Sequence, residues 1–529
     1  MSARHRGGAA VPYSGPALDR PITLCDLLEA GLSRDADADA LICAEFTWSW
    51  RTLDRVTRRL AQSYLELGLR PGDRIASLMP NRPRLIAHYI ACFRAGLVAT
   101  PLNYRYTANE IDHALAISGA RALLVHAERE PDLDESRASR HLPLGRIGYP
   151  RPSRDGISFD DLIDGEPTAP TPPPPDPSEP ALIFFTSGST GPPKGVTHTH
   201  QTVGWMLAIA AAGLELSGDD RLLAGSSLSH VGAFYVSFAA LSVGAALIVA
   251  RSFDGDELLP LLRDGRPTVL SMLPSALFAL TRDHGAHGED FASLRLCRAA
   301  GDCVSAELER EFTGLTGIVI DEAYGLTEVG LAAVSPPSQE IRVGSVGQPV
   351  PGVTVEIRSD HGGEVDVGGQ GRLWIRAPSA TVGYWDNDEA TAELFRDGWL
   401  DTGDVMRADE DGYLYFCGRR TQIIVHDGSN ITPQVVEGAL LEHPCVGSAG
   451  VVGIHDLVHG ENVRAYVTLR DGAERPAAQE LIRFARERVG YKAPEEIVFL
   501  ERMPRTASGK VDRSQLKRMA EPRQPPAGA

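Results

Sequence analysis

The sequence predicts an α/β protein: a large N-terminal domain of doubly wound parallel-sheet subdomains with a small β subdomain, and then an α+β C-terminal domain. Two observations support this. Strand-like apolar runs alternate with helical patterns through the first four hundred residues, and the pattern changes to short β segments with Gly-rich turns after about Pro336. A length of 529 residues, 43% of them hydrophobic, is ample for several compact units.

The alternation can be followed along the chain. The run "DRIASLM" predicts a buried strand at 73–79, and the apolar spacing of "RPRLIAHYIACFRAG" predicts a helix after it. A second strand is expected at "ALLVHA", 122–127, and further strands at "RLLAGSSL", "AALIVA", "PTVLSML" and "LRLCRAAG". A proline-rich connection over 164–180 leads into the strand "ALIFF". The repeated change of period indicates parallel sheets covered by helices.

The later segments predict a different architecture. "TVEIRS", "RLWIRAP" and "GYLYFCGR" read as short strands, and "VGSAGVVGIHD", "VRAYVTLR" and "AAQELIRFARERVG" as a compact α+β unit. We therefore expect a flexible N-terminus (1–20), a large domain (21–417), a hinge (418–422) and a small C-terminal domain (423–529).

Composition excludes several classes of protein. The net charge of −18, without a dominant basic stripe, argues against a nucleic-acid binder. Seven cysteines without a C-x-x-C pair, and no signal-like apolar segment, indicate a cytoplasmic protein with reduced thiols. The run of twenty uncharged residues at 231–250 is long enough to cross a bilayer, but its glycines and small residues favour a buried helix that leads into a buried strand.

A glycine- and hydroxyl-rich loop, "TSGSTGPPKG", follows the predicted strand "ALIFF". It matches neither a Walker A loop nor a Rossmann fingerprint, yet its backbone N–H groups, hydroxyls and lysine suit the binding of phosphates. Open α/β sheets bind ligands at the carboxyl ends of their strands, which is where this loop is expected. The candidate phosphate-binding residues are Thr186, Ser187, Gly188, Ser189, Thr190, Gly191 and Lys194.

Four further motifs follow in order: "YGLTE", "DTGD", "GRR" and "PRTASGKVDR". With the loop, they resemble the adenylate-forming superfamily of acyl-CoA synthetases, peptide-synthetase adenylation domains and firefly-type luciferases, most closely the acyl-CoA synthetases. The resemblance covers residues 21–517, and it implies that the C-terminal domain is mobile about the hinge at 418–422. It implies an enzyme that uses ATP and Mg²⁺ to convert a carboxylic acid into acyl-AMP, and then forms a thioester with coenzyme A.

The resemblance implies roles for the "YGLTE" segment. Tyr324 would present its ring to adenine, with Gly325 beside it, and Thr327 would contact phosphate. Glu328 would bind Mg²⁺, a hard cation for which one carboxylate plus phosphate oxygens suffices.

Other nucleotide contacts are implied elsewhere. Asp404 matches the acid that binds the ribose hydroxyls, and Arg419 the arginine that contacts ribose and phosphate. Ala300, Gly301 and Asp302 match the segment along the adenine edge, where the family more often has glycine at the position of Ala300.

Two residues are expected near the reacting atoms. Lys510 matches the C-terminal catalytic lysine, whose flexible ammonium suits a transient charge clamp. His230 lies where the family keeps an aromatic residue or a histidine between the acyl pocket and the α-phosphate. Amino-acid adenylating domains place an aspartate next, whereas this chain has Val231, so we expect an acid without an α-amino group.

The junction departs from the acyl-CoA synthetase pattern. Thr421, Gln422, Asp427 and Val435 replace a lysine, the hinge aspartate, a glycine and a glutamate, respectively. An aspartate at 427 would add bulk and charge in the pantetheine tunnel. Coenzyme A is the expected acceptor; the alternative is weak transfer to coenzyme A, with the acyl group passed to a carrier protein or partner enzyme. A third hypothesis, a nucleotide-binding regulatory protein without turnover, is disfavoured by the intact motifs.

Overall fold

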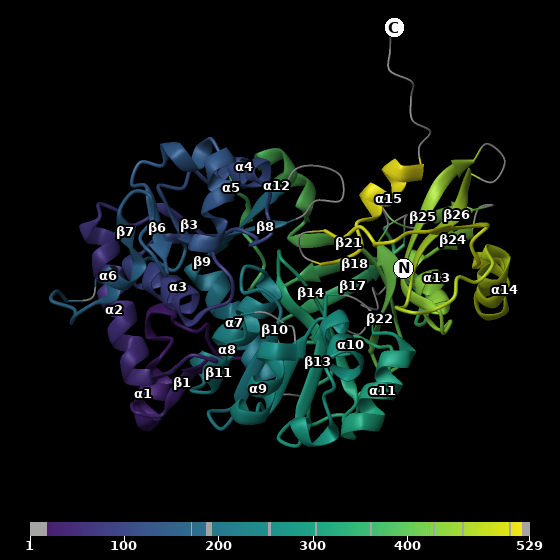
Figure 1. Ribbon diagram of the computed structural model, residues 1–529, viewed down its shortest axis with the longest axis horizontal. Coiled ribbons are helices and arrows are strands. Elements are labelled where there is room, and N and C mark those ends of the chain that lie inside the picture. The colour runs from purple at the N-terminus through teal and green to yellow at the C-terminus, as the bar shows by residue number, and fades with distance from the viewer. Residues whose placement is uncertain are drawn as a thin grey trace, which may run out of the picture.

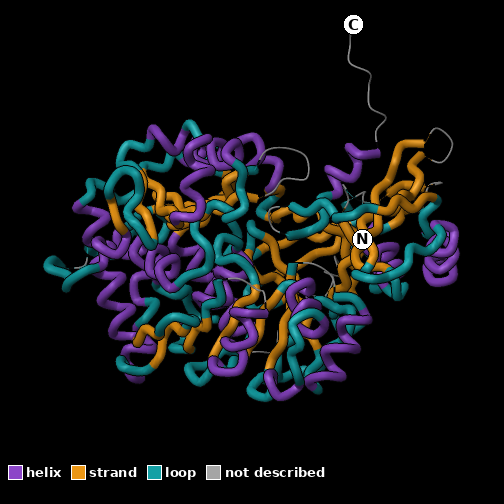
Figure 2. Tube along the Cα trace, in the orientation of Figure 1, coloured by secondary structure: helices purple, strands orange, loops and turns teal. Residues whose placement is uncertain are grey.

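The computed structural model confirms the predicted fold class, with two mixed, largely parallel sheets, an antiparallel half-barrel and a small C-terminal α/β sheet (Figures 1 and 2). It describes residues 18–170, 172–186, 193–251, 255–301, 304–359, 362–419, 422, 424–426, 429–456, 460–506 and 509–520.

The first sheet has the strand order β19-β9-β8-β4-β3-β5-β6-β7. From β8 to β7 all neighbours are parallel, whereas β9 and β19 are antiparallel additions at one edge. The predicted strands at 73–79 and 122–127 are β3 and β5. The strands are β3 (Arg74–Leu78), β4 (Val98–Pro101), β5 (Ala122–His126), β6 (Arg146–Tyr149), β7 (Ile157–Ser158), β8 (Pro180–Thr186), β9 (Lys194–Thr199) and β19 (Gly383–Tyr384).

The second sheet has the order β16-β15-β14-β13-β12-β10-β11-β1-β2 and is parallel from β14 to β1. Its strands are β1 (Asp39–Ile42), β2 (Thr47–Ser49), β10 (Arg221–Gly225), β11 (Ala246–Ile248), β12 (Val269–Met272), β13 (Leu296–Ala300), β14 (Ile320–Leu326), β15 (Gly330–Val334) and β16 (Gln348–Pro349). The β14–β15 hairpin carries the "YGLTE" motif.

The helices of the large unit lie on and between these sheets (Figure 1). They are α1 (Glu29–Asp35), α2 (Trp50–Glu66), α3 (Pro83–Ala95), α4 (Ala108–Ser118), α5 (Glu130–Glu135), α6 (Phe159–Ile163), α7 (His200–Gly213), α8 (Val231–Ser242), α9 (Gly255–Gly265), α10 (Pro274–Arg282), α11 (Ala306–Thr316) and α12 (Asp388–Leu394).

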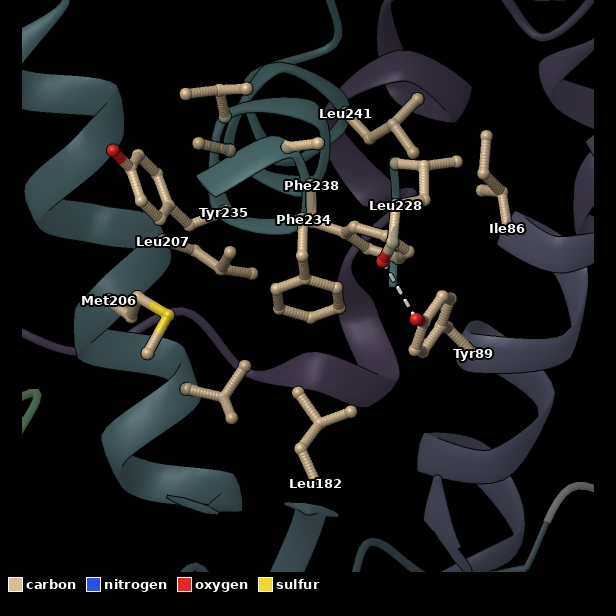
Figure 3. Close-up of a cluster of buried hydrophobic side chains, with 14 of the residues drawn as sticks. Ile86, Tyr89, Leu182, Met206, Leu207, Leu228, Phe234, Tyr235, Phe238 and Leu241 are labelled. Carbon is tan, nitrogen blue, oxygen red and sulfur yellow. Dashed lines mark hydrogen bonds between the residues drawn. The ribbon is translucent and has the colours of Figure 1, made fainter. Parts of the chain in front are cut away.

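Helix α8 and strand β11 account for the twenty uncharged residues at 231–250. Within α8, Phe234 and Phe238 stack with ring centroids 4.4 Å apart, and Tyr89 of α3 meets both edge-on (Figure 3). The Tyr89 hydroxyl donates to the carbonyl of Leu228 at 2.8 Å. The run is thus core. No helix among the described residues is long and apolar enough to cross a bilayer.

The half-barrel and the C-terminal sheet complete the fold. The half-barrel, antiparallel throughout, contains β17 (Thr354–Arg358), β18 (Gln370–Arg376), β20 (Phe395–Arg396), β21 (Trp399–Ala408) and β22 (Leu414–Arg419). The C-terminal unit contains β23 (Ile424–His426), β24 (Ser429–Ile431), α13 (Pro433–Leu441), β25 (Val446–Asp456), β26 (Gly460–Leu469), α14 (Ala478–Val489), β27 (Glu496–Phe499) and α15 (Arg513–Ala520).

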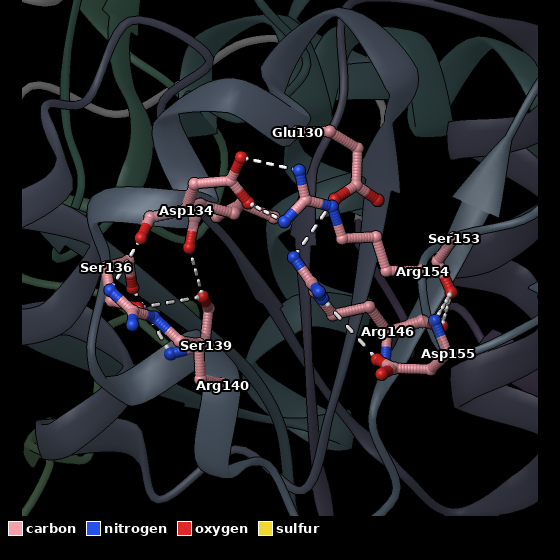
Figure 4. Close-up of polar contacts among 10 residues, drawn as sticks. Glu130, Asp134, Ser136, Ser139, Arg140, Arg146, Ser153, Arg154 and Asp155 are labelled. Atoms are coloured by element: carbon pink, nitrogen blue, oxygen red, sulfur yellow. Dashed lines mark hydrogen bonds and ion pairs between the residues drawn. The ribbon is translucent and has the colours of Figure 1, made fainter.

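A polar cluster braces the outer edge of the first sheet (Figure 4). Arg146 of β6 pairs with Glu130 at 3.0 Å and Asp155 at 3.4 Å, and Arg154 pairs with Asp134 at 2.6 Å. This cluster stabilises the edge strands and contains none of the predicted site residues.

Candidate active site

The predicted phosphate loop joins the antiparallel strands β8 and β9. Thr186, the last residue of β8, pairs directly with Lys194, the first residue of β9. The Lys194 ammonium lies 5.0 Å from the ring centroid of Tyr384, close enough for a cation–π contact. The predicted residues between these strands, Ser187, Gly188, Ser189, Thr190 and Gly191, lie outside the described part of the chain.

Glu328 is held in the β14–β15 turn next to Tyr384. The Tyr384 hydroxyl donates to Glu328 Oε1 at 2.9 Å, and the Thr381 N–H donates to the Glu328 carbonyl at 2.7 Å. Burial raises the pKa of the Glu328 carboxyl, and the bond from Tyr384 partly offsets that rise. A half-buried carboxylate next to Tyr384, whose ring Lys194 also contacts, is a suitable oxygen ligand for a hard divalent cation.

Thr327 is positioned through its backbone by a buried histidine. His198 of β9 donates from Nε2 to the Thr327 carbonyl at 2.8 Å, and burial lowers the pKa of this histidine to about 4. The neighbouring Gly325 lies so close to the facing strand that a side chain there would meet the carbonyl of Gly330 at 2.4 Å. The turn is therefore anchored to both sheets.

The residues assigned to adenine and ribose lie side by side. The Tyr324 hydroxyl donates to Asp404 Oδ2 at 2.6 Å, and Arg419 Nε donates to the other carboxylate oxygen at 2.7 Å. Asp404, which is 2% exposed, raises the pKa of Arg419 by its charge. The Tyr324 ring stacks against Phe416 with centroids 6.5 Å apart. This network links β14 to the half-barrel strands β21 and β22.

Lys510 reaches the large unit at the end of β13. Ala300 is the last residue of this strand, and Gly301 follows with φ of +92°, a conformation that strongly favours glycine. A Cβ built on Gly301 would lie 4.0 Å from Lys510 Cε, so the lysine passes directly over this backbone. The predicted Asp302 lies outside the described residues.

His230, immediately before α8, is the second predicted residue at this place. Burial lowers its pKa to about 4, with smaller contributions from the positive charges of Lys510 and Arg105. Its Nε2 lies 3.0 Å from Asn103 Nδ2. The structure therefore brings His230 and Lys510 together, although they come from different units of the fold.

Three ion pairs hold the C-terminal unit and its contact with the large unit. Arg513, three residues later, pairs with Glu437 of α13 at 2.5 Å. Arg470 pairs with Glu307 of α11 across the two units at 3.3 Å, and Arg282 pairs with the same carboxylate at 2.6 Å. These contacts hold the C-terminal unit against the large unit in the arrangement that places Lys510 over β13.

Three described residues of the predicted hinge, Gly418, Arg419 and Gln422, show how this segment is held. Gln422 donates its N–H to the Arg419 carbonyl at 2.8 Å, and the Thr432 hydroxyl donates to the Cys417 carbonyl. Gly418 has φ of +123°, and a side chain there would meet Thr432 at 2.9 Å. Residue Asp427, at which the family pattern changes, lies outside the described residues.

Sequence reasoning missed Asn103 and Tyr384. Asn103 is 127 residues away from its partner His230, and Tyr384 is 56 residues away from Glu328. Neither residue belongs to a motif singled out above. Tyr384 lies in the polar segment "GYWDND", and a tyrosine in such a segment can indicate a hydrogen bond from its hydroxyl. Among the described residues, no group of three or more His, Cys, Asp or Glu side chains could hold a metal by itself.

Comparison with known proteins shows the family to which the chain belongs. A family model for AMP-binding enzymes matches residues 28–385, and a model for the C-terminal domain of the AMP-binding enzymes matches residues 435–510. A feruloyl-CoA synthase from Amycolatopsis sp is 33% identical over 89% of this chain and 93% of its own length. A fatty acid–[acyl-carrier-protein] ligase from Streptomyces coeruleorubidus is 31% identical over 90% of this chain and 92% of its own.

A solved structure shows the same fold with a ligand of the expected type. The anthranilate CoA ligase in complex with anthranoyl-AMP superposes with a TM-score of 0.87 and 26% identity, covering 95% of this chain and 98% of that one. With both family models matched in order, the chain belongs to the AMP-binding enzymes and is an AMP-forming acid–thiol ligase of the acyl-CoA synthetase type.

Proposed function

We propose that the chain condenses a carboxylic acid without an α-amino group with MgATP to acyl-AMP and pyrophosphate, and then transfers the acyl group to the thiol of coenzyme A. The meeting of Lys510 with Gly301 and His230 carries this proposal. Lys510 and Gly301 are far apart in sequence, yet the lysine lies over the end of β13. That arrangement suits adenylate formation.

The chemistry requires charge neutralisation above all. A carboxylate oxygen forms a bond to the α-phosphorus while the bond to the β-phosphate oxygen breaks, so two anions must approach each other. In this proposal the Lys510 ammonium would contact both anions. His230 is neutral at pH 7 because burial lowers its pKa to about 4, so it can line the site without competing for the anions. Thr186 and Lys194 would hold the leaving pyrophosphate.

Glu328 is the residue that would hold Mg²⁺, with phosphate oxygens completing the coordination. Glu328 is half-buried, the desolvation of its carboxyl raises its pKa, and a nearby cation would favour the charged form. When bound, the metal would supply further neutralisation of the triphosphate. Tyr384 keeps the carboxyl oriented through the 2.9 Å bond to Oε1.

We propose a substrate without an α-amino group because of Val231, the first residue of α8. Val231 occupies the position at which a carboxylate would be needed to compensate a buried ammonium. The rest of α8 is apolar and largely buried, so it provides an apolar wall. Two of the relatives named above act on aryl acids by their names, a feruloyl and an anthranilate substrate, and one acts on a fatty acid.

A screen of pyrophosphate release tests this proposal. Fatty, alicyclic, aryl and amino acids would each be added with MgATP, with and without coenzyme A, while acyl-AMP and acyl-CoA are measured separately. We expect release with at least one acid that lacks an α-amino group. Stronger release with any of the twenty amino acids, or release that does not depend on an acid, would overturn the proposal.

The alternative acceptor is the thiol of a carrier protein. Val435, at the start of α13, is 44% exposed where the family pattern has a glutamate, so it presents an apolar side chain close to the junction. One relative is an acyl-carrier-protein ligase. If Asp427 crowds the thiol tunnel, acyl-AMP should form readily while its transfer to free coenzyme A is slow, and Asp427→Gly should accelerate only the transfer. Equal rates for both steps in the parent would exclude this alternative.

A further inference from the structure

Arg298 is a buried arginine with unused hydrogen-bond donors. It lies in the middle of β13 and is completely buried. Its Nη2 donates to Asp321 Oδ2 of β14 at 2.5 Å, but neither Nε nor Nη1 has a hydrogen-bond partner among the described residues. A buried donor that is left unpaired destabilises the fold, so a ligand that uses these donors would account for their retention.

The arginine faces the proposed acyl site. Strand pairing aligns Ser271 of β12, Arg298 of β13 and Asp321 of β14, so the three side chains point to one face of the sheet. Ala300 lies two residues further along β13, on that same face, and next to it Gly301 lies under Lys510. This is the face on which α8 packs, and Tyr235 of α8 is close enough to Arg298 for the two to interact electrostatically.

Open space separates this face from the first turn of α8. A Cβ built on Gly232 would have no atom within 4 Å. Ser271 and Ala300 are partly exposed although both belong to central strands of the sheet. The residues next to them in sequence on these strands, Met272 and Ala299, are buried. In Figure 3, Tyr235 lies toward the helix that carries Met206 and Leu207, apart from the stacked Phe234 and Phe238. The open space therefore lies beside Ser271 and Ala300, which flank Arg298 on this face, whereas Arg298 itself is completely buried.

The existing ion pair decides which kind of group Arg298 would bind. Asp321 already neutralises the guanidinium and is itself fully buried, with its Oδ1 accepting the N–H of Ser335 at 3.3 Å. A second carboxylate would leave a net buried negative charge, which is costly. A neutral oxygen, such as a hydroxyl, carbonyl or ether, could accept from Nε or Nη1 without adding charge.

The strand spacing sets the size of the acid. Ala300 and Arg298 are two residues apart, which corresponds to about 7 Å along a strand. The carboxylate of the acid would lie near Ala300, under Lys510, so the acceptor oxygen would lie about one aromatic ring away.

We infer that Arg298 selects acids of benzoate size that carry a neutral oxygen acceptor opposite the carboxyl group. This inference rests on the proposed function, because it assigns the far end of the same acyl site. Arg298 is thus a specificity residue and takes no part in bond formation.

A matched pair of acids tests the inference. 4-Hydroxybenzoic and 4-methylbenzoic acid have nearly the same size, but only the first has an acceptor, and terephthalic acid carries a second carboxylate. We expect kcat/KM for pyrophosphate release to be at least tenfold higher with the hydroxy acid than with the other two. A ratio near one for hydroxy over methyl acid, or better use of terephthalic acid, would contradict the inference.

Variants separate selectivity from folding. Arg298→Met alone would leave Asp321 as an unpaired buried charge, so the double variant Arg298→Met/Asp321→Asn is used, in which the amide oxygen can still accept from Ser335. We expect the hydroxy-to-methyl ratio to fall to within about threefold of one. Arg295→Met/Asp220→Asn, which removes a 2.8 Å pair at the other end of the strand, should keep the parent ratio. General damage would lower both rates together.

The experiments distinguish a failure of the inference from a failure of the proposed function. If none of the three benzoic acids is activated but longer or unsubstituted acids are, the proposed function stands and the inference is wrong. An unchanged hydroxy-to-methyl ratio in the Arg298→Met/Asp321→Asn variant would have the same meaning. If no acid in the wider screen supports pyrophosphate release, the proposed function and the inference fall together.

Discussion

Asn103 Nδ2 donates a hydrogen bond to His230 Nε2 over 3.0 Å. The direction is set by the other end of the amide, because Asn103 Oδ1 accepts the N–H of Arg105 at 2.8 Å and so the NH₂ group faces the ring. A ring nitrogen that accepts cannot carry a proton, so the neutral His230 has its proton on Nδ1. The low pKa of this histidine, about 4, agrees with that assignment.

This contact predicts how activity depends on pH. In the parent, His230 stays neutral above its pKa of about 4, so acyl-AMP formation should show no inflection from this residue between pH 5.5 and 8. Asn103→Asp would put a carboxylate beside the ring, favour the protonated form and raise the pKa of His230. We expect activity of the variant to fall as pH decreases from 7.5 to 5.5. Asn103→Leu should change the rate without adding an inflection, and an inflection shared by all three proteins would refute the assignment.

The second prediction concerns Glu328. Glu328→Gln keeps an oxygen that can accept the bond from Tyr384, but it removes the negative charge proposed to hold Mg²⁺. We expect the Mg²⁺ concentration for half-maximal pyrophosphate release to rise at least about tenfold, since a neutral amide is a much weaker ligand. Tyr384→Phe retains the carboxylate and serves as the control, with a smaller change. An unaltered Mg²⁺ dependence in Glu328→Gln would remove this residue from the metal site.

The pair between Arg470 and Glu307 predicts a small effect confined to one half of the reaction. Both side chains are partly exposed, 31% and 20%, and such pairs contribute on the order of 0.5 kcal/mol. Arg470→Gln should therefore slow acyl-AMP formation by about two- to threefold, because it loosens the arrangement with Lys510 over β13. Transfer to the thiol should not slow.

Arg464→Gln provides the matched control for Arg470→Gln. Its 2.7 Å pair with Glu496 lies wholly within the C-terminal unit. We expect both half-reactions of this variant to match those of the parent. Equal slowing of both steps in Arg470→Gln would mean that the contact serves general stability.

Much of the fold could be predicted because local patterns determine it. The strand predicted at "DRIASLM" and the helix predicted after it correspond to β3 and α3. The uncharged run at 231–250 corresponds to α8 and β11. Here apolar spacing, β-branched residues and a helix-ending Gly96 agree with the tertiary packing. The order of the strands in each sheet could not be read from these patterns, because it depends on contacts between distant segments.

The candidate site was predicted unevenly for the same reason. Tyr324, Asp404 and Arg419 belong to recognisable motifs, and the structure brings them together as one hydrogen-bonded group. Asn103 belongs to no motif, and only the fold brings it into contact with His230. Arg298 belongs to "LRLCRAAG", which the sequence predicts as a strand. Its unpaired donors could not be predicted, because they depend on which face of β13 the side chain occupies and on how α8 packs against that face.

Single-turnover formation of acyl-AMP by Lys510→Ala tests the central claim most directly. With the acid identified in the screen, we expect the rate to fall at least about a hundredfold while ATP binding is retained, as for a contact that strengthens in the transition state. Lys517→Ala, an exposed lysine of the following helix α15, should keep the parent rate. A near-normal rate in Lys510→Ala would contradict the assignment of this lysine to acyl-AMP formation, and with it the account of the site.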